Sequence, residues 1–126
     1  MTRKIVQIDI GVHPGGRGMA NCGWTKDGKV TGGHLSGDDP PFVHIDESTI
    51  PKEILDDIWK EAEALGEAVF SLNVAQDPKW TGYNELMISF ETGDPMRVCW
   101  PFGEENRDQR LKRLLDLLFK NKIGGW

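Results

Sequence analysis

The chain has 126 residues, of which 38% are hydrophobic and 28% are charged, and its formal net charge is −5. This length and composition predict one folded domain over residues 1–126 and exclude an intrinsically disordered chain. The negative charge argues against a sequence-independent hold on nucleic acid, and no stretch approaches the roughly 20 apolar residues that span a bilayer. We therefore expect a cytoplasmic protein with neither a nucleic-acid nor a membrane partner.

The first predicted element is a strand over Ile5 to Val12, where apolar and polar residues alternate with a period of two. Gln7 and Asp9 interrupt the apolar run along this segment, so it cannot serve as a signal-peptide core. A glycine-rich turn follows at residues 13–18. The next alternation is centred on Asp27-Gly28, a pair typical of two-residue hairpin turns, and predicts the second and third strands.

The middle of the chain predicts a loop, a short extended piece and then a helix. The extended piece covers Phe42 to Ile45, and Pro51 suits the first turn of the helix, with Ser48 or Thr49 available as a cap. Gly66 is expected to end this helix. Residues 67–74 fit either a docking segment or a strand, and residues 76–84 are expected to form a loop. The apolar face of the helix consists of Ile54, Leu55, Ile58, Trp59, Ala62 and Leu65.

The last third predicts a second hairpin, closed by Pro101, and a final helix. The strands of this hairpin alternate around Leu86 to Phe90 and Met96 to Trp100, and leucines three or four apart mark the helix. Leu114 and Ile58 should share one core between the helices and the sheet. The pattern as a whole predicts an α+β fold, a mostly antiparallel sheet of about five strands with two helices packed on one face.

This order of elements, with a turn built on Gly15, Gly16 and Gly18 after the first strand, resembles the small emfourin-like inhibitors of metallopeptidases. The resemblance covers most of the chain as a layout and carries no diagnostic residue. It implies a role in binding another protein and transfers no inhibitory residue.

Catalytic and metal chemistry receive little support from the sequence. His34, His44 and Asp46, with Glu47, lie close together in the chain and are the best candidates for a metal site or for a small His/carboxylate-dependent hydrolase. The alternative is that they are surface histidines beside solvated carboxylates, and we predict neither a metal nor a cofactor. Whether these side chains converge is left open.

The two cysteines should not form a disulfide, because they are expected on opposite faces of the sheet. Cys22 shares the inward parity of Trp24, whereas Cys99 lies between the inward-facing Val98 and Trp100.

The aromatic residues provide the candidate binding site. Trp24, Trp59 and Trp100 fall on predicted apolar faces, whereas Trp80 and Tyr83 occur among polar, turn-forming residues. Such rings either anchor a partner or fold inward to close the end of the sheet. Arg17, in the glycine-rich turn, is a further binding candidate because it could pair with an anion.

The charge is unevenly distributed along the chain. Residues 38–67 contain ten acidic residues against two lysines, whereas residues 107–126 contain six basic residues against two acidic ones. The acidic segment is either a docking surface for a basic partner or a solvated helix face. We expect a non-enzymatic protein-binding module, of which an inhibitor-like protein is one form, with a hydrolase or metal-binding protein and a structural homo-oligomer subunit as alternatives.

Overall fold

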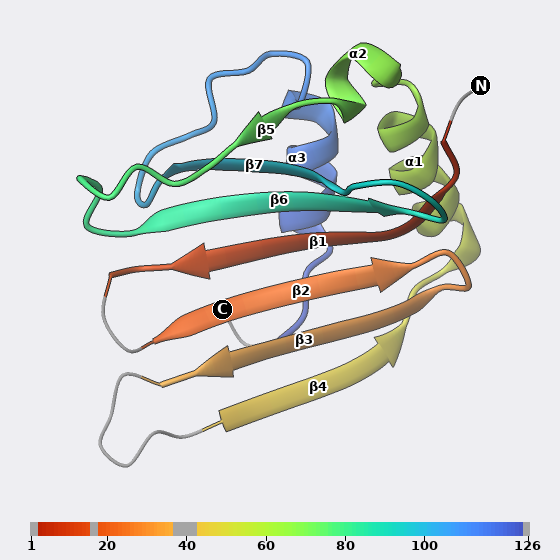
Figure 1. Cartoon of the computed structure of the whole chain (residues 1–126). Coiled ribbons are helices and arrows are strands. Elements are labelled where there is room, and N and C mark those ends of the chain that lie inside the picture. The colour runs from red at the N-terminus through yellow and green to blue at the C-terminus, as the bar shows by residue number, and fades with distance from the viewer. Residues whose placement is uncertain (1–2, 16–17, 37–42, 125–126) are drawn as a thin grey trace.

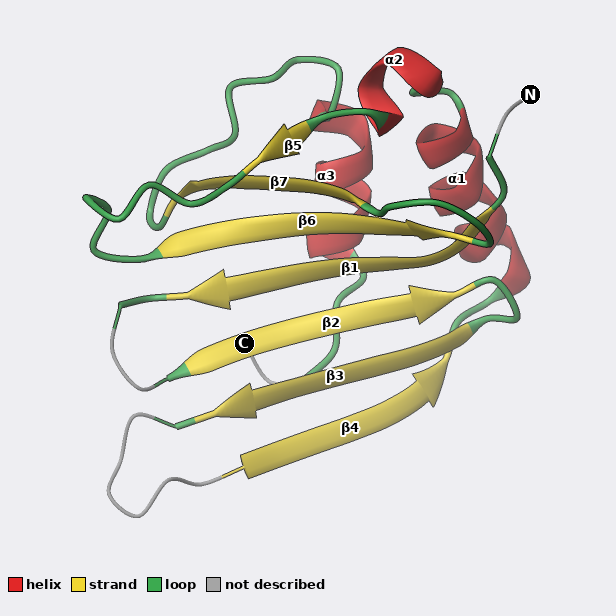
Figure 2. Cartoon of the chain, in the orientation of Figure 1, coloured by secondary structure: helices red, strands yellow, loops and turns green. Residues whose placement is uncertain are grey.

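The computed structural model describes residues 3–15, 18–36 and 43–124 (Figure 1). Seven strands form one sheet in the order β4-β3-β2-β1-β6-β7-β5, and only the β5–β7 pair is parallel. Figure 2 shows α1 and α3 on one face of this sheet, with α2 at its β5 end. The elements are β1 (Ile5–His13), β2 (Met19–Thr25), β3 (Lys29–Leu35), β4 (Val43–Thr49), α1 (Lys52–Glu63), α2 (Glu67–Phe70), β5 (Asn73–Val74), β6 (Tyr83–Phe90), β7 (Met96–Pro101) and α3 (Lys112–Lys120).

The predicted fold class is confirmed, but the number of elements is larger than expected. The sheet is mixed and has seven strands instead of about five, and the described residues form three helices instead of two. One added strand is β4, which runs through Thr49 where only a short extended piece was expected. Its side chains are mostly exposed, so it lacks the strong alternation that identifies a half-buried strand. The second added strand is the two-residue β5, and the added helix is the one-turn α2.

The first hairpin has a three-residue turn, not the predicted two-residue turn. Thr25 and Lys29 end the strands, and the N–H of Gly28 donates to the carbonyl of Thr25 over 3.0 Å. Gly28 has a φ of +94°, whereas Asp27 does not have a positive φ. A single left-handed glycine closing a three-residue loop is the common alternative to the two-residue turn.

A bulge near the start of β1 changes which side chains face inward. The register against β6 shifts between Ile5 and Gln7, so that Ile5 is buried and Val6 is exposed. The sequence alternation had placed Val6 on the buried face. A bulge inserts one residue without a cross-strand partner and therefore reverses the parity on one side of it.

The helix boundaries also differ from the expectation. Pro51 precedes α1, no side chain caps its first turn, and Ser48 and Thr49 belong to β4. Gly66, with a φ of +80°, does not end α1, which stops at Glu63, but is the N-cap residue of α2.

The hydrophobic core lies between α1, α3 and the face of the sheet that they cover. Ile58 and Leu114 are both buried in it, as predicted, and so are the three expected core tryptophans. No helix within the described ranges is long and apolar enough to cross a membrane. The largest fully buried side chains are Trp24, Phe70, Ile8, Ile10, Ile58, Leu86, Ile88, Met96, Leu111, Leu114, Leu118 and Cys22.

The opposite face of the sheet, which we call the outer face, carries no helix (Figure 2). Because β1 is central, its outward side chains lie beside those of β2 and β6, although these strands are far apart in the chain. The outer face therefore brings together side chains that are far apart in the sequence, such as Gln7 and Ser89, which are 82 residues apart.

Candidate functional site

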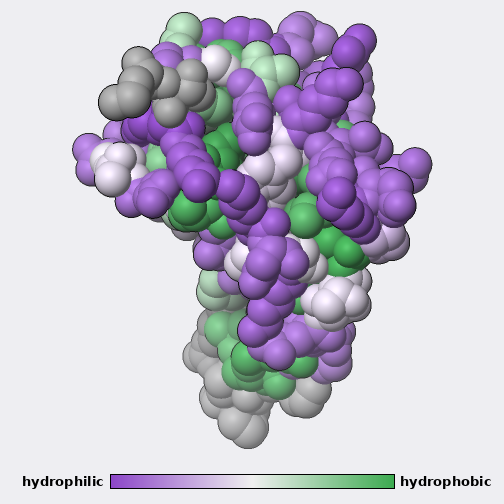
Figure 3. Space-filling view, turned by 90° about the vertical axis from the view of Figure 1, so that its right-hand side faces the viewer, coloured by the Kyte–Doolittle hydropathy of each residue, from purple (hydrophilic) through white to green (hydrophobic). Residues whose placement is uncertain are grey.

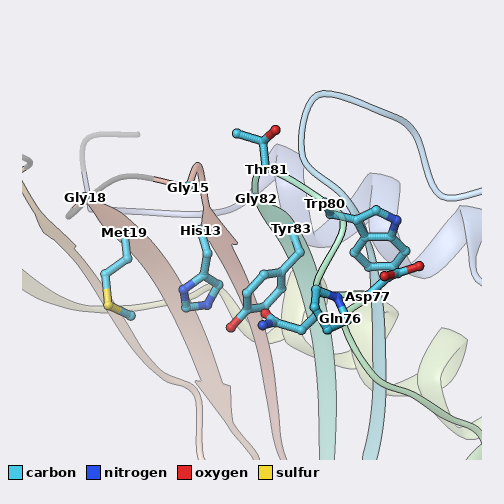
Figure 4. A pocket seen from close by; sticks show the side chains of 11 residues that line it. His13, Gly15, Gly18, Met19, Gln76, Asp77, Trp80, Thr81, Gly82 and Tyr83 are labelled. Atoms are coloured by element: carbon cyan, nitrogen blue, oxygen red, sulfur yellow. The ribbon is translucent and has the colours of Figure 1, made fainter.

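A pocket of about 280 Å³ opens on the outer face at the ends of β1, β2 and β6 (Figure 4). Its wall includes both aromatic residues that the sequence suggested as binding residues. The residues that line it are His13, Gly15, Gly18, Met19, Gln76, Asp77, Pro78, Trp80, Thr81, Gly82 and Tyr83.

Tyr83 belongs to β6 and not to the preceding loop, which corrects the expectation from the sequence. It is paired with His13 on one side and with Pro101 on the other. The rings of Tyr83 and His13 are stacked, with centroids 4.3 Å apart and planes 15° from parallel. Figure 4 shows Met19, His13 and Tyr83 standing in a row, one from each of three adjacent strands. Cross-strand pairing therefore holds both rings on a rigid element.

Trp80 comes from the segment between β5 and β6, and its side chain is half-buried. The turn that carries it is held by Asp77, whose carbonyl accepts from the N–H of Trp80 over 3.0 Å and whose carboxylate accepts from the N–H of Lys79 over 2.9 Å. In Figure 4 the indole lies beside Asp77, apart from the stacked pair. Neither Trp80 nor Tyr83 belongs to the buried core.

Two glycines let the segments around the pocket approach each other closely. A Cβ atom on Gly82 would lie 2.3 Å from the carbonyl oxygen of His13, and one on Gly15 would lie 2.0 Å from that of Thr81. Gly15 also has a φ of +93°, which favours glycine. The turn after β1 and the segment before β6 are thus in direct backbone contact, and this contact shapes the pocket.

The part of the outer face next to the pocket carries polar side chains. The amide of Gln7 donates to both carboxylate oxygens of Asp9, over 3.0 and 3.2 Å, and the guanidinium of Arg97 pairs with Glu85 over 2.6 Å. Burial raises the pKa of Asp9; the Gln7 hydrogen bond opposes this, and the nearby Glu85 charge adds to it. A Cβ on Gly23 would lie 2.3 Å from the Asp9 carboxylate, so this glycine leaves room for it.

The two cysteines lie on opposite faces of the sheet and are not joined, as predicted. Cys22 faces the core, whereas the thiol of Cys99 lies 3.8 Å from a carboxylate oxygen of Glu85 on the outer face. Burial is the main reason that the pKa of each thiol is raised. Both are therefore protonated at neutral pH and lack the thiolate that a nucleophile requires.

Of the histidine and carboxylate candidates, His34, His44 and Asp46 converge on the margin of the sheet away from the pocket, whereas Glu47 faces the other side and pairs with Lys29 over 3.5 Å. His34 and His44 face each other across β3 and β4 with ring centroids 5.2 Å apart, and His44 contacts Asp46 over 2.9 Å. Nδ1 of His34 lies 2.9 Å from the carbonyl oxygen of Gly124. The described residues contain no group of three His, Cys, Asp or Glu side chains arranged to hold a metal. Arg17, the third binding candidate, lies outside the described residues.

None of the described residues of the acidic segment lines the pocket. The segment's exposed carboxylates Asp56 and Asp57 are on α1, which Figure 2 shows on the opposite face of the sheet.

A second pocket, of about 350 Å³, lies between α3 and the segment that follows β7. Asn84 lines it and is the only buried polar residue within the described part of the chain. The amide of Asn84 donates to the carbonyl of Pro101 over 3.5 Å, a long hydrogen bond. The sequence did not lead us to predict a role for Asn84, although its position two and four residues before Leu86 and Ile88 gives it the same inward parity and so predicts a buried polar side chain.

Comparison with models of known protein families and with curated protein sequences finds no match for this chain. Its function must therefore be inferred from the surfaces described above.

Proposed function

We propose that this protein is a protein-binding module and that it binds through the outer face, at the pocket between β1, β2 and β6. The observation that carries the proposal is a row of apolar and aromatic side chains across four strands, which we call the outer-face strip. It consists of Leu35, Met19, His13 and Tyr83, with Trp80 beside it.

The strip has the properties of a contact surface. Cross-strand pairing links Leu35 to Met19 and His13 to Tyr83, so the row follows the pleat and stays on one face. Met19 is 37% exposed and no helix covers it. Rigid aromatic rings beside an adaptable methionine bury a large area at low entropic cost when a partner arrives.

The surroundings favour a partner segment with an apolar or aromatic anchor flanked by Lys or Arg. Asp77 lies on the pocket wall, and Asp9 lies on β1 on the same face; Glu85 of β6 is already paired with Arg97. The pocket volume suits one or two side chains, and negative charge beside it would attract a basic flank.

Site-specific photo-crosslinking in the source cells tests this proposal. A photoreactive amino acid is placed at position 80 or 19, and at position 31 as the control, because Thr31 is an exposed outer-face residue away from the strip. We expect one discrete crosslinked product from positions 80 and 19 that is absent at position 31. The same products from all three positions would contradict the proposal.

A double substitution separates binding from stability. Trp80→Ala with Tyr83→Ala should abolish the product crosslinked from position 19, while the melting temperature falls by only a few degrees, because both rings are half-buried. A large loss of thermal stability with crosslinking unchanged would instead make the two rings a plug for the end of the sheet.

An inhibitor-like role, which the emfourin-like layout implies, is one form of this function. It predicts that an excess of the protein lowers the activity of a metallopeptidase on a peptide substrate, and that the Trp80→Ala, Tyr83→Ala variant does so less. Undiminished peptidase activity would remove this form of the proposal and leave the binding surface to the crosslinking test.

The cytoplasmic location is part of the same proposal. It is supported by the two buried, unbridged thiols, since small exported domains commonly depend on disulfides.

A further inference from the structure

The outermost strand on one side of the sheet, β4, is the least protected element of the fold. Within the described residues it is paired with β3 alone, and its Val43 and Ile45 side chains are 60% and 66% exposed. Natural proteins usually shorten, cover or bend such an edge, because it offers a template for another strand. At seven residues, β4 is among the longer strands of this sheet.

The helical layer does not extend to this edge. Figure 1 shows α1 and α3 behind the other half of the sheet, and Figure 3 shows hydrophobic side chains gathered at the narrow lower end, where β3 and β4 lie. His44 and Asp46 point toward the side of the sheet that carries the helices, yet their side chains are 40% and 46% exposed. Among the described residues, no helix or strand covers either face of β4, so both faces are accessible to a neighbouring chain.

We propose that the occupant of this edge is a second copy of the chain, which pairs β4 with the partner's β4 in antiparallel orientation across a two-fold axis at Ile45. The two seven-stranded sheets then form one continuous sheet. Such an axis runs perpendicular to the sheet and keeps the outer faces of both copies on the same side.

Charge and hydrophobicity select this register. With the axis at Ile45, that residue faces the partner's Ile45, and His44 faces the partner's Asp46, a pairing that occurs twice because of the symmetry. The registers centred on Asp46 or Glu47 also pair at least five residues of each strand, but each places two identical carboxylates opposite one another. Like charges directly opposite are destabilising, whereas apolar and opposite-charge pairs stabilise a ladder.

Cysteine scanning tests both the dimer and its register. Only a residue on the axis comes close enough to its own copy for a disulfide, which needs Cβ atoms about 4 Å apart. Ile45→Cys should give a disulfide-linked dimer under mild oxidation. Val43→Cys should not, because four residues separate it from the partner's Val43, roughly 13 Å along the strand. The native cysteines are buried and do not interfere.

Sedimentation of the unmodified chain and of a charged variant completes the test. We expect a concentration-dependent mass of twice the monomer, and a dissociation constant at least about tenfold larger for Ile45→Asp, which places two carboxylates on the axis. Asn21→Asp is the control and should dimerise normally, because Asn21 is an exposed residue of β2, away from the edge, and lies opposite Gly11 and Gly33.

Three results would overturn the proposal. A wild-type chain that remains monomeric up to about 1 mM, with no crosslinking of Ile45→Cys, would mean that β4 receives no second copy, including the case in which it accepts a strand of another protein. Crosslinking of Asp46→Cys in place of Ile45→Cys would refute the register. Dimerisation unaffected by Ile45→Asp would place the contact elsewhere. Since Trp80 and Tyr83 are not involved, this result is independent of the crosslinking proposed for the outer-face strip.

Discussion

At the scale of single residues, the structure depends on small side chains at close backbone contacts. Gly82 is the clearest case, because its φ is not in the left-handed region and the nearby backbone of His13, Pro14 and Gly15 excludes a larger residue. We expect Gly82→Ala to lower the free energy of unfolding by about 1–3 kcal/mol, the usual cost of overpacking. Gly11→Ala is the matched control, since its Cβ would meet only an ordinary contact at 3.5 Å. Equal denaturation midpoints for the two variants would contradict this explanation.

The half-buried carboxyl of Asp9 predicts a pH dependence of stability. Because its pKa is raised in the folded state, the fold disfavours the charged form, and stability falls as the pH rises from about 4 through the folded-state pKa. Asp9→Asn should therefore raise the melting temperature at pH 7, and this gain should disappear below about pH 4, where Asp9 is protonated in both states. Melting curves between pH 3 and pH 8 measure the effect. Asp57→Asn, at an exposed position on α1, is the control. A gain that is independent of pH would show that charge is not the cause.

At the scale of elements, α3 shows how an amphipathic pattern becomes core packing. Leu114 is 1% exposed and lies in the same cluster as Ile58 of α1, whereas the adjacent Arg113 is exposed. Leu114→Ala should lower the free energy of unfolding by about 2–5 kcal/mol. Arg113→Ala, on the same helix, should change it by less than about 0.5 kcal/mol. Chemical denaturation compares them, and an unchanged midpoint for Leu114→Ala would mean that the helix face is wrongly assigned.

At the scale of the whole molecule, the segment after α3 crosses the core face of β2 and β3. The N–H of Ile123 lies 3.5 Å from the thiol of Cys22, and a Cβ on Gly32 would lie 2.1 Å from the Ile123 carbonyl oxygen. The C-terminal segment therefore closes a part of the core that the helices leave open.

Ending the chain at Asn121 should expose Cys22 to alkylating reagents. We expect its modification rate in the native protein to rise at least about tenfold, because local opening would no longer be required, while Cys99 reacts at its original rate. Gly32→Ala, which displaces the segment in a full-length chain, should act in the same direction. Mass spectrometry of the labelled peptides distinguishes the two thiols. An unchanged rate for Cys22 in both variants would show that the segment does not cover it.

The amino-acid sequence by itself determined the elements with strong periodicity. The alternation in β1, β6 and β7 and the leucine spacing of α3 were sufficient, because each buries one regular face and burial imposes a period on the residues. The opposite orientation of Cys22 and Cys99 followed from the same parity. The exposed β4, the short β5 and the bulge at Val6 were missed because few of their side chains face the core.

Only the tertiary structure decided which distant side chains meet. Pairing of β1 with β6 stacks His13 on Tyr83, and pairing of β3 with β4 brings His34 to His44; neither contact leaves a periodic trace in the sequence. Strand order depends on long-range pairing, which local propensity does not encode. The candidate residues Trp80 and Tyr83 could therefore be selected from the sequence by composition, but the pocket that they share with Met19 could not.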